Sequence, residues 1–141
     1  MLTAVVAILV LGLVLALVVL VAKDDGPPPA DVALAYERAW DTFDFESLWS
    51  LSADELRDGM GRKDFVAAKS AAYAGQQGLG HLALSVTVED VRAANTVAVV
   101  HTRVELRDGT HATNEVHLAK RAGRWVVVEY RLRSDAPPPS P

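Results

Sequence analysis

The chain has 141 residues, a formal net charge of -4 and no cysteine. The acidic balance argues against a general nucleic-acid-binding protein, because such proteins present a basic surface. The lack of cysteine excludes disulfides, thiolate metal sites, a cysteine nucleophile and a lipid-modified cysteine. Apart from one apolar and two proline-rich segments, roughly a hundred residues remain, which is enough for one small domain.

The N-terminal segment is predicted to be a transmembrane anchor. Leu2–Ala22 contains no charged residue, and as a helix it would extend about 31 Å, close to the ~30 Å hydrocarbon core of a bilayer. Residues 1–22 are therefore expected to hold the protein in the lipid bilayer as a single span. The alternative is a signal peptide cleaved after Ala22, which would release a secreted binding domain, although the basic start and clear cleavage site of such peptides are absent.

Two proline-rich segments flank the domain. Residues 23–30 read KDDGPPPA, and their prolines predict a stiff, extended spacer. Residues 134–141 show no apolar periodicity and are predicted to be a disordered tail. The α+β domain is expected between them, at residues 31–133.

The first half of the domain has helical periodicity. A first helix, capped by Asp31, is predicted from apolar residues on one stripe: Val32, Tyr36, Ala39, Trp40 and Phe43. A short helix is expected over residues 44–51. The sequence Ser52-Ala53-Asp54-Glu55 resembles a capping box that starts another turn, and a third helix is expected over residues 63–77.

After Gly80 the apolar period changes to two, which predicts β-strands. Four strands are expected, over residues 82–89, 96–107, 110–121 and 124–133. Gly109 and Gly123 each fit a three-residue turn that ends in a left-handed glycine. These two turns place Thr102 opposite Asn114, and Asn114 opposite Tyr130, on the apolar inner face of the sheet.

The inner face is the candidate ligand site. Asn114 and Tyr130 could orient a ligand carbonyl or hydroxyl. The full predicted set is the polar row Thr102, Asn114 and Tyr130 with the aromatic walls Tyr36, Trp40, Trp49 and Tyr73. The alternative is that the row is only a mutually satisfied group of hydrogen bonds.

No catalytic residue is predicted. The inner strand positions beside the polar row are apolar. The helix carboxylates Glu37, Asp41 and Asp44 are more typical of a solvated helix face. A metal triad of His101, Glu115 and His117 can be drawn on the outer face, but exposed polar pairs are more typical of such a surface, so no metal or cofactor is expected.

The other end of the outer face is predicted to be apolar and to form a homodimer interface. Its residues in the predicted register are Val97, Val99, Ala119, Trp125 and Val127. The alternative is that the linker or the tail folds back over this patch.

Three motifs carry a family resemblance: AYERAW at residues 35–40, DFESLW at residues 44–49 and GRWVVV at residues 123–128. With helices followed by an antiparallel meander, the chain resembles the nuclear-transport-factor-2-like superfamily. It is similar in particular to small membrane-anchored actinobacterial members, including mammalian-cell-entry-associated proteins. The resemblance implies a cone of helices on a curved four-stranded sheet, an extracytoplasmic domain on the cell membrane and dimers formed through the sheet.

Two functional hypotheses follow. The first is a membrane-anchored, non-enzymatic accessory or interaction module that holds a small apolar ligand and contacts an unidentified membrane protein. The second is a small isomerase- or cyclase-like enzyme that uses the same cavity, since the superfamily includes such enzymes. A carboxylate or histidine that points into the cavity beside Asn114 would favour the second.

Overall fold

The computed structural model describes residues 6, 8–16 and 26–133. Residues 8–16 are helical and exposed. Within the described ranges, no helix combines the length and the apolar character needed to cross a membrane. Most of the predicted anchor, the first part of the predicted linker and the predicted tail lie outside the described residues.

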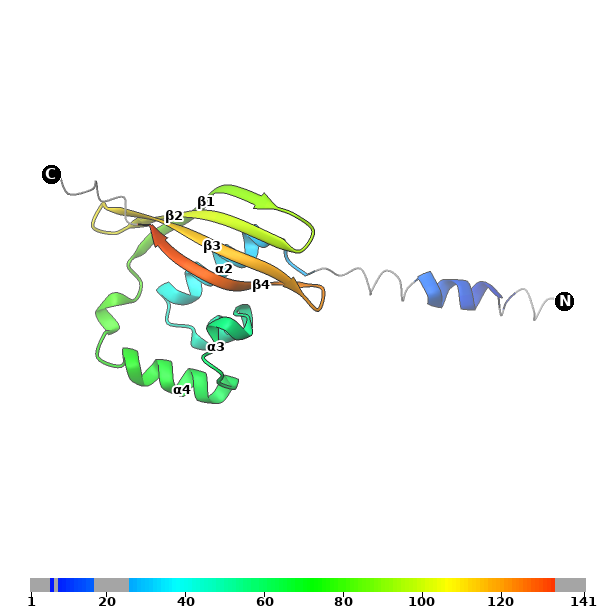
Figure 1. The fold of residues 1–141 in the computed structure, drawn as a ribbon, viewed down its shortest axis with the longest axis horizontal. Coiled ribbons are helices and arrows are strands. Elements are labelled where there is room, and N and C mark those ends of the chain that lie inside the picture. Colours follow the sequence, from blue (N-terminus) through cyan, green and yellow to red (C-terminus); the bar gives the residue numbers. More distant parts are fainter. Residues whose placement is uncertain (1–5, 7, 17–25, 134–141) are drawn as a thin grey trace.

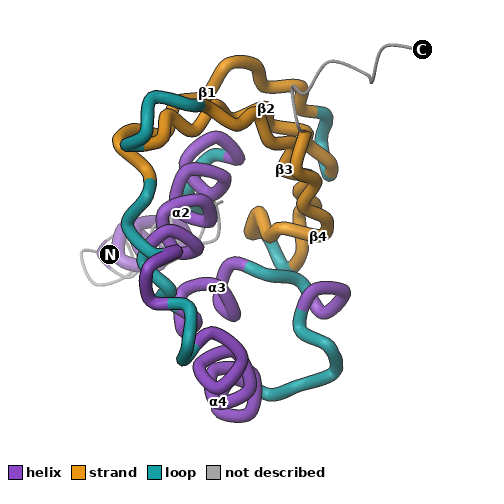
Figure 2. Tube along the Cα trace, turned by 90° about the vertical axis from the view of Figure 1, so that its left-hand side faces the viewer, coloured by secondary structure: helices purple, strands orange, loops and turns teal. Residues whose placement is uncertain are grey.

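The domain is a four-stranded antiparallel meander with helices on one face (Figures 1 and 2). The strands follow in chain order across the sheet: β1 (Ala83–Ala93), β2 (Val97–Leu106), β3 (His111–Arg121) and β4 (Arg124–Arg133). The helices are α2 (Pro29–Asp41), α3 (Phe45–Leu51) and α4 (Arg62–Tyr73), with 3-10 turns at Asp54–Leu56 and Gln77–Leu79. This arrangement confirms the expected α+β layout.

Helix α2 begins earlier than predicted. Its first residue is Pro29, Pro28 occupies the N-cap position, and no side chain caps the helix. The prediction that Asp31 caps it is therefore wrong. Proline suits the first turn because its φ angle is already helical and it has no N–H to satisfy. Asp31 lies in that first turn, where its negative charge interacts favourably with the helix dipole.

Helix α3 begins as predicted, because Asp44 accepts hydrogen bonds from the backbone N (3.0 Å) and Oγ (2.6 Å) of Ser47. The predicted capping box after it does not form. Ser52 is buried and forms a parallel bridge with Val127, and the next N–H, that of Ala53, donates to the Val127 carbonyl at 2.8 Å. The segment thus pairs with the edge of β4 instead of capping a helix.

The β2–β3 register is confirmed in full. Thr102 lies opposite Asn114 and Val100 opposite Val116. Gly109 has φ 85°, the left-handed conformation that the predicted turn requires. Val100 and Val116 are both completely buried, as expected for paired inner-face residues.

The predicted β3–β4 register is wrong. It places Leu118 opposite Val126, whereas the structure places Leu118 opposite Val127. The cause lies in the turn: Ala122 (φ 50°) and Gly123 (φ 76°) are both left-handed, so the strands close through a two-residue loop. A left-handed alanine is unfavourable, so this two-residue loop runs against local preference.

A β-bulge in β4 shifts the register again. His117 pairs with Glu129 while Leu118 pairs with Val127, so Val128 has no partner residue on β3. Since alternate residues of a strand point to opposite faces, the extra residue reverses the alternation. Val127 is therefore buried in the core, and Tyr130 also faces inward.

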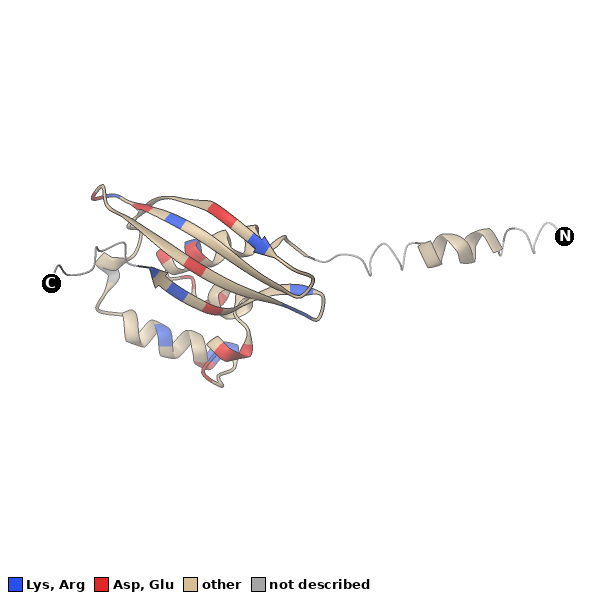
Figure 3. Ribbon diagram, turned by 45° about the horizontal axis from the view of Figure 1, so that its top comes forward, with Lys and Arg blue, Asp and Glu red and all other residues tan. Residues whose placement is uncertain are grey.

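Because of these shifts, two of the five residues of the predicted outer-face patch do not belong to it. Val127 is completely buried, and Trp125 lies opposite Lys120 and packs against the core. Val97 still pairs with Ala119, while Val99, two residues further along β2, pairs with His117. Acidic and basic residues are distributed along the strands (Figure 3). The homodimer stays a prediction, and its proposed apolar surface is smaller than the sequence suggested.

Candidate functional site

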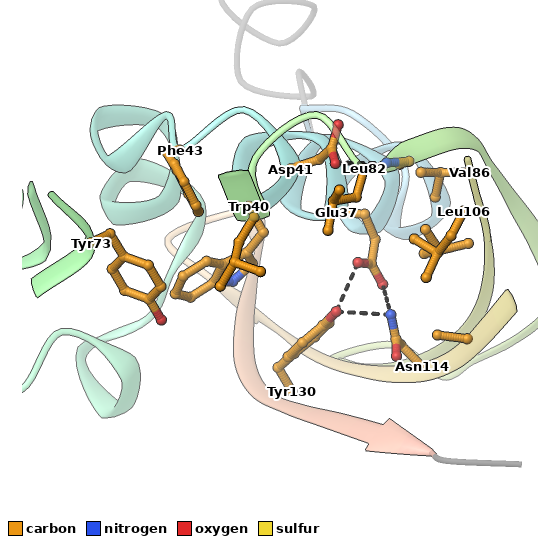
Figure 4. Close-up of a pocket in the computed structure, with 14 residues that line it drawn as sticks. Glu37, Trp40, Asp41, Phe43, Tyr73, Leu82, Val86, Leu106, Asn114 and Tyr130 are labelled. Carbon is orange, nitrogen blue, oxygen red and sulfur yellow. Dashed lines mark hydrogen bonds between the residues drawn. The ribbon is translucent and has the colours of Figure 1, made fainter. Parts of the chain in front are cut away.

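The centre of the site is a buried carboxylate on α2. Glu37 is only 5% exposed. Its Oε1 atom accepts hydrogen bonds from Thr102 Oγ1 (2.5 Å) and Asn114 Nδ2 (3.0 Å), and its Oε2 atom accepts one from the Tyr130 hydroxyl at 2.8 Å. One helix is thereby joined to three successive strands. Figure 4 shows the bonds that Glu37 makes with Asn114 and Tyr130. We call these four residues the Glu37 cluster.

The hydrogen bonds of the cluster fit an ionised Glu37. Each of its three partners donates to the carboxylate, and Asn114 Nδ2 also donates to the Tyr130 hydroxyl at 2.9 Å. A buried carboxylate is tolerated only when such donors replace its water, and donors to a charged group form the stronger hydrogen bonds. The cluster is therefore a stable way to keep one negative charge inside the domain.

Backbone geometry explains how the cluster assembles. Thr102 and Asn114 are a cross-strand pair, so their side chains lie side by side on the inner face. Tyr130 lies opposite Val116, one inner position from Asn114, and the bulge at Val128 turns it inward. Its ring centroid is 5.4 Å from that of Tyr36.

The environment keeps the Tyr130 hydroxyl protonated. Burial raises the pKa of Tyr130 far above its ordinary value, and the negative charge of Glu37 and the hydrogen bond to it raise the pKa further. Burial also raises the pKa of Tyr36. At neutral pH, Tyr130 is thus a hydrogen-bond donor.

The cluster borders a pocket of about 280 Å³ between α2 and the sheet. Aromatic side chains lie to one side of the cluster and aliphatic ones to the other (Figure 4). Four polar residues line it, namely Glu37, Asp41, Asn114 and Tyr130. The remaining lining residues are Trp40, Phe43, Tyr73, Leu79, Leu82, Ala83, Val86, Val104, Leu106 and Ala112. Such an apolar pocket with a few convergent polar groups is typical of small-molecule sites.

The structure brings most of the predicted site residues together. Thr102, Asn114 and Tyr130 form the expected polar group, and Trp40 and Tyr73 line the pocket. Tyr36 lies behind Tyr130 and lines a second pocket of about 270 Å³, which shares Trp40 and Tyr130 with the first. Trp40 and Tyr73 thus line the pocket beside Glu37 while Tyr36 lines the neighbouring one, and ligand binding by these residues stays a prediction.

Trp49 does not line the pocket beside Glu37. Its Nε1 donates to the Met60 carbonyl at 3.1 Å, and the guanidinium of Arg57 stacks 3.8 Å from its ring centroid. Trp49 therefore stabilises the connection between α3 and α4, and the sequence could not distinguish this role from a ligand wall.

Sequence reasoning placed Glu37 on a solvated helix face, and the structure corrects this. A signal was present: Glu37 lies four residues after Ala33 and three before Trp40, and Ala33 is completely buried. Residues at these spacings share a helix face. The buried face of α2 thus includes Ala33 and Glu37 in addition to the large apolar residues that the sequence analysis counted.

On the outer face, Glu115 is the common partner of two histidines. His117 Nε2 lies 2.6 Å from Glu115 Oε1, and His101 Nε2 lies 3.7 Å from Oε2. Arg133 Nε lies 3.4 Å from the same Oε2 atom. Across the residues that the structure describes, no group of three such side chains is arranged to hold a metal ion. The predicted polar pairs exist there as a cluster of close polar contacts around Glu115.

No known family profile matches the sequence, and no curated protein matches it. Solved structures do match. An NTF2-like protein of unknown function from Shewanella oneidensis is 21% identical with a TM-score of 0.52, over 72% of this chain and 93% of that one. An NTF2-like protein from Campylobacter jejuni, provisionally named a transpeptidase, is 18% identical with a TM-score of 0.51, over 72% of this chain and 97% of that one.

At these identities the neighbours are informative about architecture and not about activity. Each is covered almost completely, so the match includes the helices as well as the meander. The chain therefore has the α+β fold of the NTF2-like proteins.

Proposed function

We propose that the domain is a non-enzymatic binding module that holds a small, mainly apolar molecule in the pocket beside Glu37. The observation that carries the proposal is the pocket itself: an apolar lining of about 280 Å³ with one polar group of side chains set into it. This volume lies just below the usual range for ligand sites, which suits a compact ligand.

The hydrogen bonding of the cluster favours binding over catalysis. Isomerases and cyclases that act on carbonyl compounds need free donors where negative charge develops on oxygen. Here Thr102, Asn114 and Tyr130 already donate to Glu37. A carbonyl ligand would have to break one of these bonds to obtain a donor.

One observation favours the enzymatic alternative. Glu37 is a carboxylate that lines the pocket beside Asn114, and a carboxylate in reach of a ligand can act as a general base. The test is conversion of cyclohex-3-enone to its conjugated isomer by the full chain. We expect no turnover above the buffer rate. Turnover that Glu37→Gln abolishes would establish the alternative in place of the binding module.

The membrane attachment is part of the proposal. It is supported by the uncharged segment Leu2–Ala22, and we place the domain on the extracytoplasmic side, where it would present its ligand to an unidentified membrane protein. The native protein should fractionate with membranes and retain residues 1–22. An intact mass corresponding to a chain that begins at Lys23 would contradict this and favour the secreted form.

Ligand binding can be tested by filling the pocket. Ala112 lines it from β3, whereas Ala119 on the same strand pairs with Val97 on the outer face. Binding of 1-adamantanol, a compact apolar alcohol, should raise the melting temperature of the full chain in neutral detergent, by mass action. Ala112→Leu should abolish this rise and Ala119→Leu should leave it unchanged. Equal rises in both variants would contradict the proposed site.

A further inference from the structure

We propose that the pocket selects ligands whose polar end is a hydrogen-bond donor, and that it binds a protonated amine most tightly. The inference rests on the proposed ligand-binding function and specifies the chemical class of the ligand. It follows from an inventory of the donors and acceptors that the Glu37 cluster has left after its own hydrogen bonds are made.

The cluster has no donor hydrogen left. The hydroxyls of Thr102 and Tyr130 have one hydrogen each, and both are directed at Glu37. The Asn114 amide has two hydrogens, of which one is donated to Glu37 and the other to the Tyr130 oxygen. A ligand that offers only acceptors, such as a ketone, ester or carboxylate, therefore finds no partner in the cluster.

Acceptor capacity does remain. Asn114 is 3% exposed, and its Oδ1 atom receives no hydrogen bond from any described residue. An unsatisfied buried carbonyl oxygen is unfavourable and calls for a donor. Glu37 Oε2 accepts one hydrogen bond, from Tyr130, and has a second lone-pair site. Both residues line the pocket, so a ligand donor there can complete these bonds. Trp40 Nε1 is a buried donor in the same lining and has no partner among the described residues, so a ligand acceptor can bind there; an amine is still favoured, because its hydrogen bond to a carboxylate is charge-assisted.

The amide orientation of Asn114 follows from the same contacts. If its oxygen and nitrogen were exchanged, Oδ1 would lie 3.0 Å from the Glu37 carboxylate and bring two acceptors together. The donating NH₂ group must therefore face Glu37, and the free oxygen faces elsewhere. The surplus of acceptors is thus a property of the network and not of an arbitrary assignment.

Charge selects among donors. The pocket lining contains two carboxylates, Glu37 and Asp41, and its described residues include no lysine, arginine or histidine. Asp41 Oδ1 accepts from the backbone N of Ala83 at 2.9 Å, which holds its negative charge at the pocket edge. A cationic ligand compensates the negative charge of these two carboxylates, whereas an anionic ligand is repelled by it. An ammonium group on an apolar body fits both the acceptors and the field.

The experiment compares four probes with the same cage: 1-adamantanamine, 1-adamantanol, 1-adamantyl methyl ketone and adamantane-1-carboxylate. Dissociation constants are measured for the full chain in neutral detergent by calorimetry. We expect the amine to bind about tenfold or more tighter than the ketone, with the alcohol between them and the carboxylate weakest, since a charge-assisted hydrogen bond is the stronger kind. Ala112→Leu is the blank for partitioning into micelles.

A charge-matched pair of variants sharpens the result. Glu37→Gln removes the buried charge and supplies amide donors, so the amine should lose about tenfold in affinity while the ketone gains. Glu46→Gln removes the same charge from an exposed site on α3, where Glu46 Oε2 lies 3.6 Å from Arg62 Nη1, and should change neither affinity. A retained amine preference in Glu37→Gln would overturn the role of Glu37.

The unmodified chain decides the matter even if Glu37→Gln does not fold. Ketone or carboxylate binding as tight as amine binding would overturn the inference while the pocket remained a binding site. If none of the four probes binds the unmodified chain more tightly than the Ala112→Leu blank, the proposed binding function itself fails.

Discussion

The two faces of the sheet carry parallel constructions that differ in their access to water. His101 and Thr102 are neighbours on β2, and Asn114 and Glu115 are neighbours on β3, so two adjacent rungs contribute one pair of side chains to each face. On the inner face Thr102 and Asn114 donate to Glu37 of α2. On the outer face His101 and its neighbours surround Glu115.

Each carboxylate has three partners, but the consequences differ. Glu37 is enclosed by α2 and the sheet, and every partner is a neutral hydroxyl or amide with a fixed position. Glu115 interacts with histidines and with Arg133, whose side chain is 62% exposed and can exchange its contact for water. The inner cluster therefore specifies structure and ligand chemistry, while the outer cluster tolerates change.

The largest expected effect breaks the inner cluster. Glu37→Ala leaves three buried donors without an acceptor and opens a cavity, so it should lower the free energy of unfolding by about 3 kcal/mol. Glu115→Ala should cost far less, because water replaces its partners. Chemical denaturation of the two full-chain variants, followed by circular dichroism, measures both. Equal losses would show that the two faces are energetically alike.

A smaller effect removes one hydroxyl. Tyr130→Phe deletes the donor to Glu37 Oε2 and the acceptor for Asn114, and should lower the free energy of unfolding by about 1–2 kcal/mol. Tyr73→Phe is the matched control, since it removes a hydroxyl from the same pocket wall outside the Glu37 cluster. If Tyr73→Phe costs as much, the cluster adds nothing specific.

The inner face should also limit stability at high pH. The pKa of Tyr130 is raised above the ordinary value of 10.0, so above about pH 10 the unfolded chain releases this proton while the folded chain keeps it. The stabilisation that the protonated Tyr130 hydroxyl provides is therefore fully present below pH 10 and is lost progressively as the pH rises. Tyr130→Phe should flatten this alkaline decline in melting temperature. An unchanged slope would mean that Tyr130 does not titrate on unfolding.

The outer face should affect stability at low pH, and by a smaller amount than the inner face does at high pH. The hydrogen bond with His117 lowers the pKa of Glu115 below its ordinary value of 4.5. Its contribution is therefore present above about pH 4.5 and is lost as the pH falls through the lowered pKa of the folded state. The melting difference between the unmodified chain and Glu115→Gln should shrink in acid and in about 1 M salt, which screens exposed charges. A difference insensitive to salt would indicate a buried pair.

Much of the site was accessible from sequence. The alternation of β2 and β3, with a glycine required at position 109, fixed which residues of these strands face inward, so Thr102 and Asn114 were identified together. The aromatic stripe of the first helix gave Trp40 as a pocket wall. Local periodicity and turn chemistry suffice here because each pattern is repeated along a whole element.

The parts that depended on tertiary contacts were missed. The spacing of Glu37 from Ala33 and Trp40 indicates the buried face of the helix, but only the three donors on the sheet make a carboxylate favourable there. Tyr130 was expected on the inner face and lies there, but it is opposite Val116 instead of Asn114, because of a bulge at Val128 and a left-handed Ala122 that both oppose local preference. No sequence pattern in β4 predicts the bulge or the left-handed residue.

The sequence by itself thus determined the order of the elements, the α+β class and the inward row of β2 and β3, because backbone alternation and helix periodicity are local properties. The tertiary structure alone decided that Val127 joins the core, that Tyr130 meets Glu37 and that an open acceptor remains in the pocket. These features arise from the packing of α2 against the sheet, where burial makes an unsatisfied polar group far less favourable than a strained turn or a bulge.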